Sequence, residues 1–242
     1  MKIKNLSVNM EEKRILKAIS FEIYKGESLG IIGGSASGKT TLLHVLGEFL
    51  SGSSFQVKGE MEYCVGGKPK SYLILQDAIH SLNPYENIEK QLMETYAFHH
   101  KKENKEKQKR EIEKILLSLG FEDIKSLLSS YPGALSGGMK QRIAIALILC
   151  CEVDLLLADE PTTALDAVNQ LRFVQILKKI CKERNITLVY VSHDIRVLMQ
   201  LCHRIIIMKH GEIIETGKRE EIWKQPQNEY TKELIYSVKN LL

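Results

Sequence analysis

The sequence predicts an α/β fold in which a parallel β-sheet core carries an antiparallel β portion and an α-helical insertion at residues 77–150. Three observations predict this fold. The apolar run 28–32 leads through a glycine-rich loop into a helix-like segment, as in the βα units of parallel sheets. Residues 2–8 and 19–24 alternate apolar with polar side chains, the pattern of antiparallel strands. From Leu155 onward, short apolar runs alternate with helix-like segments.

The other elements follow from apolar runs, from helical periodicity and from the loops between them. Further strands are predicted at residues 59–65, 72–76, 155–158, 186–192, 204–208 and 212–215. Helices are predicted at residues 85–100, 139–151, 169–184 and 195–202, with a short helical tail at 219–242. The charged segment 101–114 predicts an exposed helix with one apolar face. A nucleic-acid-binding arm is the weaker alternative, because glutamates cancel much of its positive charge.

The composition is that of an ordinary globular protein, with 44% hydrophobic and 26% charged residues. A net charge of +4, from 34 basic and 30 acidic residues, is too small and dispersed to indicate a nucleic-acid partner, so we expect none. The longest apolar run, 143–151, is too short to cross a bilayer, and the N-terminus lacks the apolar region of a signal peptide. Five cysteines without C-x-x-C spacing predict reduced thiols rather than disulfides or a zinc site.

The glycine-rich loop predicts a phosphate-binding site. Residues 33–40 fit the pattern G-x-x-x-x-G-K-[ST], with a strand before them and a helix after them. Lys39 is expected to reach the β- and γ-phosphates of a nucleoside triphosphate, and the Thr40 hydroxyl to bind Mg²⁺. The alternative, a surface turn that happens to carry Lys-Thr, does not explain the flanking elements. The residues of the predicted site are Gly33, Gly34, Ser35, Ala36, Ser37, Gly38, Lys39, Thr40 and Thr41.

A pair of carboxylates ends the apolar strand at 155–158. Asp159 is expected to orient Mg²⁺, and Glu160 to polarise a water molecule that attacks the terminal phosphate. The alternative is that Asp-Glu merely begins a solvated loop. The presence of a phosphate-binding loop in the same chain favours the catalytic interpretation.

A second phosphate-binding device is predicted at the start of the apolar helix 139–151. Ser136 is a natural helix cap, and Gly137 and Gly138 leave the backbone N–H groups accessible. Taken alone, this start of a helix is a plain cap. Because one nucleotide needs only one phosphate cradle, a second cradle suggests a site shared between two chains.

Taken together, these motifs resemble those of the nucleotide-binding subunits of ABC transporters along nearly the whole chain. Residues 33–41 resemble the Walker A motif, Asp159 and Glu160 the Walker B pair, and 164–166 the D-loop. The other matching residues are the Q-loop glutamine Gln76, the switch histidine His193 and the signature residues Leu135, Ser136, Gly137, Gly138, Met139 and Gln141. The resemblance implies the ABC ATPase fold, with a RecA-like P-loop NTPase core.

The resemblance also implies how the site residues act. Glu160, His193 and Gln76 would be catalytic, and Thr40, Gln76 and Asp159 would hold Mg²⁺. ATP would lie between the Walker A motif of one chain and the signature of its partner, with Asp166 at the interface of the two chains. The family places an aromatic residue on adenine near Met10. Met10 is the residue that occupies that place here, and its thioether is expected to pack on the base.

The resemblance implies partners, a location and a domain organisation. The partners are a second ABC ATPase chain in a heterodimer, two transmembrane permease subunits and, indirectly, an extracellular solute-binding protein. The chain would be peripheral on the cytoplasmic face of the cell membrane. One ABC ATPase domain, 1–242, is expected: a core of 1–76 and 151–215, a helical subdomain of 77–150, and a C-terminal tail of 216–242.

Four short segments resemble the peptide/nickel importer branch of the family: 82–84, 130–132, 161–166 and 229–232. Met139 in the signature and Gly34 in the phosphate loop resemble the D-type nickel import ATPase of that branch. The sequence therefore predicts an ATPase that drives uptake of nickel, as an ion or a chelate. The alternatives are an importer of oligopeptides, dipeptides or other metal chelates, a soluble ABC ATPase without a transport role, and a P-loop kinase.

Overall fold

The computed structural model describes residues 1–50, 54–63, 67–75, 82–163 and 166–239. The chain forms two units. The β-rich unit comprises Met1–Ile74, Asp154–Glu160 and Lys178–Leu242, and the helical unit comprises Leu75–Val153 and Pro161–Leu177. In this division residues 151–153 and 161–177 group with the helical unit, and the C-terminal tail groups with the β-rich unit.

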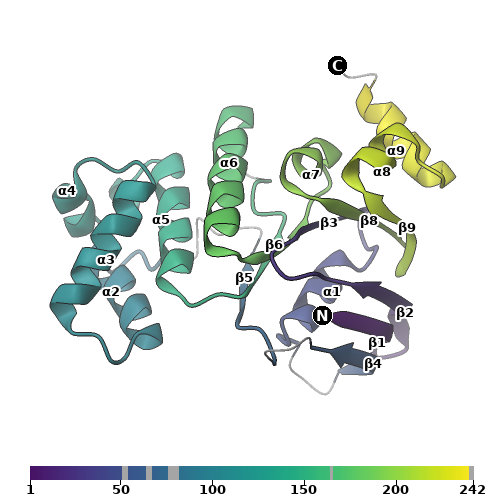
Figure 1. Cartoon of the computed structure of the whole chain (residues 1–242), viewed down its shortest axis with the longest axis horizontal. Helices are drawn as coiled ribbons and strands as arrows, with labels where there is room; N and C mark the ends of the chain where they lie inside the picture. Colours follow the sequence, from purple (N-terminus) through teal and green to yellow (C-terminus); the bar gives the residue numbers. More distant parts are fainter. Residues whose placement is uncertain (51–53, 64–66, 76–81, 164–165, 240–242) are drawn as a thin grey trace. The chain divides into compact units, whose positions relative to one another are not determined.

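A six-stranded sheet forms the centre of the β-rich unit, in the order β5-β6-β7-β3-β8-β9 (Figure 1). Its strands are β3 (Ser28–Gly33), β5 (Ser71–Ile74), β6 (Leu155–Asp159), β7 (Thr187–Val191), β8 (Arg204–Lys209) and β9 (Glu212–Lys218). All neighbouring strands are parallel except β8 and β9. Every residue of β3, β6 and β7 is buried, as expected for parallel strands covered on both faces. Their carboxyl ends therefore meet at one edge of the sheet.

The second sheet of this unit is antiparallel, with the order β2-β1-β4. Its strands are β1 (Lys2–Met10), β2 (Lys13–Glu22) and β4 (Phe55–Glu62). Leu6, Val8 and Leu16 pack in one core with Leu42 and Leu43 of helix α1 (Lys39–Leu46). The apolar residues of the alternating sequence pattern form the face of this sheet that packs into the core.

The sequence misplaced strand β4, which begins at Phe55 rather than at Gly59. Gly59 lies inside the strand with a φ of +118°, and a Cβ there would lie 2.8 Å from the Asn5 carbonyl oxygen. The glycine is therefore required by a close approach of β1, and it does not mark a turn. Residues 64 and 65 of the predicted strand lie outside the described residues.

The remaining helices of the β-rich unit are α7 (Ile195–Leu201), α8 (Arg219–Lys224) and α9 (Glu229–Lys239). Strand β9 continues to Lys218, beyond the predicted end at residue 215, and the tail that follows it forms two helices. Helix α6 (Ala167–Arg184) begins in the helical unit and ends in the β-rich unit.

The helical unit contains α2 (Ile88–His99), α3 (Lys105–Ser118), α4 (Ile124–Ser129) and α5 (Gly137–Cys150). Side chains of Asn87, Asn104 and Asp123 cap the first three of these helices. The sequence did not predict α4, because six residues are too few to show a helical period. Among the described residues, no helix is long and apolar enough to cross a membrane.

Candidate functional site

The phosphate-binding loop connects β3 to α1 at the carboxyl edge of the parallel sheet. Two of its glycines are required by the space around them. A Cβ on Gly33 would lie 2.3 Å from the Met208 carbonyl oxygen, and one on Gly38 would lie 2.7 Å from Leu16 Cδ2. Gly38 also has a φ of +96°, in the left-handed region. The loop therefore needs glycine at both positions in order to turn from the strand into the helix.

Lys39 is folded back onto this loop. Its Nζ donates hydrogen bonds to the carbonyl oxygens of Gly33, at 2.9 Å, and Gly34, at 3.0 Å. Burial lowers the pKa of Lys39, and the carboxylates of Glu160 and Asp159 oppose that shift. A buried ammonium group without a carboxylate within salt-bridge distance among the described residues is suited to binding an anion.

An open pocket of about 470 Å³ covers the loop and is rich in cationic side chains. Its lining residues are Lys13, Arg14, Ile15, Lys17, Ala36, Ser37, Gly38, Lys39, Thr40, Thr41 and His210. Met10 is not among them. The sequence analysis did not assign Lys13, Arg14, Ile15, Lys17 or His210 to the site. No motif contains them, and His210 comes from a turn that is distant in sequence.

Asp159 lies at the end of β6 with only 7% of its surface exposed. Burial raises the pKa of Asp159, and a hydrogen bond with the Thr40 hydroxyl partly offsets that rise. The carboxylate of Asp159 and the hydroxyl of Thr40 both offer oxygen ligands, which Mg²⁺ prefers. These two residues therefore fit the predicted magnesium site. The third predicted ligand, Gln76, lies outside the described residues.

Glu160 and His193 lie side by side at the same edge. Nδ1 of His193 is 2.9 Å from Oε2 of Glu160, although the two residues follow different strands. The Glu160 backbone has a φ of +45°, and its N–H donates to the Val191 carbonyl oxygen at 3.1 Å. The strained backbone and the histidine together fix a carboxylate just beyond the buried strands. A fixed carboxylate can accept a proton from water.

The helical unit contains the second predicted phosphate-binding site, at the start of α5. The Ser136 hydroxyl caps α5 by accepting the Met139 N–H at 3.3 Å. Among the described residues, no atom lies within 4 Å of the place where a Cβ on Gly137 would stand. Gln141 is 95% buried, and among the described residues its Nε2 has no hydrogen-bond partner. Leu135 is buried just before the cap. The start of α5 therefore leaves the backbone at Gly137 accessible. Gln141 lines the same pocket as Gly137, and its Nε2 has no hydrogen-bond partner among the described residues.

Asp166 lies in the same unit and faces the same pocket as Ser136, Gly138 and Gln141. Its two carboxylate oxygens accept the Asn169 backbone N–H at 2.9 Å and the Asn169 side-chain amide at 2.6 Å. These hydrogen bonds lower the pKa of Asp166. Asn169 Oδ1 also lies 3.5 Å from where a Cβ on Gly138 would stand. Asn169, which the sequence analysis missed, thus connects the predicted D-loop to the predicted signature. Residues 164 and 165 lie outside the described residues.

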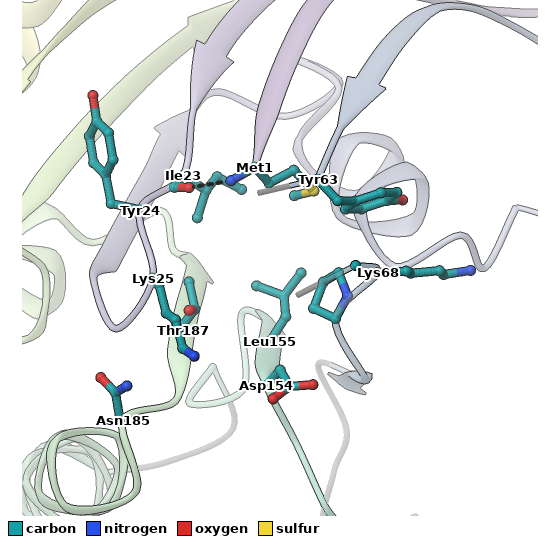
Figure 2. A pocket seen from close by; sticks show the side chains of 12 residues that line it. Met1, Ile23, Tyr24, Lys25, Tyr63, Lys68, Asp154, Leu155, Asn185 and Thr187 are labelled. Carbon is teal, nitrogen blue, oxygen red and sulfur yellow. Dashed lines mark hydrogen bonds between the residues drawn. The ribbon is translucent and has the colours of Figure 1, made fainter. Parts of the chain in front are cut away.

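A separate pocket in the β-rich unit opens at the amino ends of β6 and β7, where Leu155 and Thr187 begin these strands (Figure 2). Tyr63, Lys68 and Asp154 also line it. None of the described residues of the predicted site lines it. In parallel α/β sheets, ligands bind at the carboxyl ends of the strands, and that is where the phosphate-binding loop, Asp159, Glu160 and His193 are found.

The order and geometry of these motifs agree with a family comparison. The family model described as "ABC transporter" matches residues 16–163, which is more than half of the chain. The chain belongs to the ABC transporter family. Its fold is the ABC ATPase fold, so the fold class predicted from the sequence is confirmed.

Two relatives are ATP-binding proteins of peptide transporters from Bacillus subtilis (strain 168). This chain is 35% identical to the dipeptide transport ATP-binding protein DppD, over 93% of this chain and 71% of the relative. It is 32% identical to the oligopeptide transport ATP-binding protein AppD, over 91% of this chain and 71% of the relative.

A solved structure with the same fold contains the products of ATP hydrolysis. The dimeric, post-hydrolysis state of the ATP-binding cassette MJ0796, bound to ADP and Pi, matches with a TM-score of 0.71. The sequences are 28% identical, and the match covers 90% of this ABC protein and 98% of that chain.

Proposed function

We propose that this ABC protein is the ATP-hydrolysing subunit of an importer for peptides. The observation that carries the proposal is the pairing of Glu160 with His193 beside the phosphate-binding loop and the buried Asp159. A nucleotide-binding module without hydrolysis needs the loop alone. A carboxylate held by a histidine beside that loop is the arrangement that activation of water requires.

In the proposed reaction, the loop amides and Lys39 bind the phosphates of ATP. The ammonium group of Lys39 exchanges its two carbonyl acceptors for phosphate oxygens. Thr40 and Asp159 would hold Mg²⁺, which neutralises charge on the phosphates when it is bound. Glu160 takes a proton from the attacking water, and His193 keeps its carboxylate in place and lies near the terminal phosphate.

The remaining motifs support a site that two chains complete. The start of α5, with Ser136, Gly137 and Gly138, is proposed to bind the phosphates held by a second ABC ATPase chain, and Asp166 to lie at that interface. We propose a heterodimer of related chains, seated on two transmembrane permease subunits at the cytoplasmic face of the membrane and supplied by a solute-binding protein. ATP binding would close the dimer and hydrolysis would reopen it.

For the cargo, we propose peptides rather than nickel. Both reported relatives are ATP-binding proteins of peptide transporters, and they are similar to this chain over more than nine-tenths of its length. The expectation of nickel rested on Met139 and Gly34, two residues in motifs that bind nucleotide rather than cargo, and the relatives do not support it.

Uptake of labelled cargo by source cells that carry Lys39→Ala tests this proposal. We expect uptake of a radiolabelled dipeptide to fall to background while uptake of nickel is unchanged, because the variant lacks the ammonium group that binds phosphate. Lys58→Ala, an exposed lysine on β4, is the matched control and is expected to transport normally. Loss of nickel uptake alone would reverse the choice of cargo, and loss of neither would place the cargo in another class.

A further inference from the structure

The side chain of Tyr230, on the C-terminal helix α9, approaches the phosphate-binding loop at Gly34. A Cβ placed on Gly34 would lie 3.5 Å from Tyr230 Oη, and among the described residues it would meet no other atom within 4 Å. The Gly34 carbonyl oxygen accepts hydrogen bonds from Lys39 Nζ at 3.0 Å and from the Ser37 N–H at 3.3 Å. Tyr230 Oη therefore lies close to Gly34, whose carbonyl oxygen links the start of the loop to Ser37 and Lys39 through hydrogen bonds.

Tyr230 is held in this place from both sides. Strand β9 supplies Glu215, whose carboxylate accepts the N–H groups of Gln227, at 2.8 Å, and Asn228, at 3.0 Å, just before α9. The Asn228 side chain then accepts the Tyr230 N–H at 2.9 Å. Nζ of Lys209 lies 4.7 Å from the centre of the Tyr230 ring, within the range of a cation–π interaction. The position of the ring is thus fixed by β8, β9 and the start of α9.

We propose that Tyr230 is a positioning residue for the phosphate-binding loop, so that docking of α9 on Glu215 sets the affinity of the chain for nucleoside triphosphate. The inference rests on the proposed function, because it deepens the role of the same site. It gives the C-terminal tail, which the sequence analysis left without a role, a part in nucleotide binding.

The physical reason is pre-organisation. Gly34, Ser35 and Ala36 are exposed, and Ala36 has a φ of +58°, which a residue with a side chain adopts only when its surroundings hold it there. Tyr230 Oη lies close to Gly34, at the start of this segment. Without the ring, the loop must be ordered when the nucleotide arrives, and the free energy of binding is reduced by that cost.

Replacement of the ring by Tyr230→Ala in the full chain is the direct test, with ATP binding measured by calorimetry. We expect the dissociation constant to rise about fivefold, the size of effect that loss of one supporting contact has on binding. Amide hydrogen exchange at residues 34–37 is expected to become faster. Tyr230→Phe, which keeps the ring but removes the Oη that approaches Gly34, is expected to weaken ATP binding by less than Tyr230→Ala does.

Tyr236→Ala is the matched control, because Tyr236 lies on the same helix with 68% of its surface exposed. It is expected to leave both the affinity and the exchange unchanged. Glu215→Ala, which removes both acceptors for the start of α9, is expected to weaken ATP binding as Tyr230→Ala does.

Two failures are distinguishable in this experiment. If the unaltered chain binds no ATP, the proposed function is wrong and this inference falls with it. If the unaltered chain binds ATP and Tyr230→Ala binds it equally well, only the inference is wrong. A lowered melting temperature in Tyr230→Ala, with unchanged affinity and unchanged exchange at residues 34–37, would assign Tyr230 to stability alone and would also overturn the inference.

Discussion

Asp159 and Lys39 are two charged side chains that folding buries at the carboxyl edge of the parallel sheet. Burial favours the uncharged form of each group. It raises the pKa of the Asp159 carboxyl and lowers the pKa of the Lys39 ammonium. At neutral pH both groups are charged, and the surrounding protein stabilises these charges less well than water does. Each charge therefore lowers the stability of the folded state. The residues are thus arranged for charged ligands at the expense of stability.

Replacement of Asp159 tests this interpretation. A raised pKa means that the folded protein prefers the protonated carboxyl, so the ionised form destabilises it at pH 7 and stops doing so as the pH falls below that pKa. Asp159→Asn keeps the shape and removes the charge. We expect it to raise the melting temperature at pH 7 by about 2 °C, a shift that corresponds to roughly 1 kcal/mol in a domain of this size.

Calorimetry at pH 7 and at pH 4 measures this effect, and the gain is expected to shrink at the lower pH. The same variant is expected to lose the dependence of ATP binding on Mg²⁺. A melting temperature that falls at pH 7 would show that Asp159 stabilises the fold, which contradicts the account.

At the residue scale, the sequence predicts candidate site residues wherever they lie in a contiguous motif. The phosphate-binding loop, Asp159 and Glu160 fall into this class. The pairing of His193 with Glu160 required knowledge of which strands are neighbours, because β6 and β7 pair side by side although a long helix separates them in sequence. His210 and Tyr230 could not be found at all, since only the folded chain brings their side chains to the loop.

At the scale of elements, the attachment of α9 to β9 depends on one carboxylate. Burial opposes ionisation of Glu215, but the hydrogen bonds from Gln227 and Asn228 outweigh it and keep its pKa below the usual range. For a lowered carboxyl pKa, the stabilisation is present above the pKa of the unfolded chain and is lost as the pH falls through the pKa of the folded state.

Glu215→Gln is expected to remove this pH-dependent stabilisation. At pH 7 the variant is expected to be less stable than the unaltered chain by about 1 kcal/mol, because glutamine keeps an oxygen acceptor but loses the charge that strengthens these hydrogen bonds. The difference is expected to narrow below about pH 4.5. Denaturant unfolding at several pH values measures it, and a difference that is constant across the series would mean that the charge of Glu215 contributes nothing.

The elements that the sequence predicted well are those with a clear period or a uniform apolar run. Buried strands such as β6 and β7 and the long helix α5 are of this kind. The prediction failed where a residue type is compatible with more than one local structure. Gly59 signals a turn by its residue type, yet the approach of β1 places it within a strand. Helix α4 depends on the capping side chain of Asp123 rather than on periodicity.

At the scale of the whole molecule, the predicted functional residues divide between the two units. The β-rich unit carries the phosphate-binding loop, Asp159, Glu160 and His193, and the helical unit carries the signature residues with Asp166. We propose that each unit offers one side of a nucleotide site. We therefore expect ATP hydrolysis to require a second chain, whose signature would cover the first chain's phosphate-binding loop.

The most direct test of the central claim is ATP turnover by the assembled importer that carries Glu160→Gln. Phosphate release and ATP binding are measured in the same membranes, with the exposed Glu60→Gln as a control that is expected to behave normally. We expect Glu160→Gln to bind ATP with unchanged affinity and to release phosphate at least about a hundredfold more slowly, because the amide cannot accept the proton of water. Undiminished phosphate release by this variant would contradict the account, because Glu160 would then not be the base.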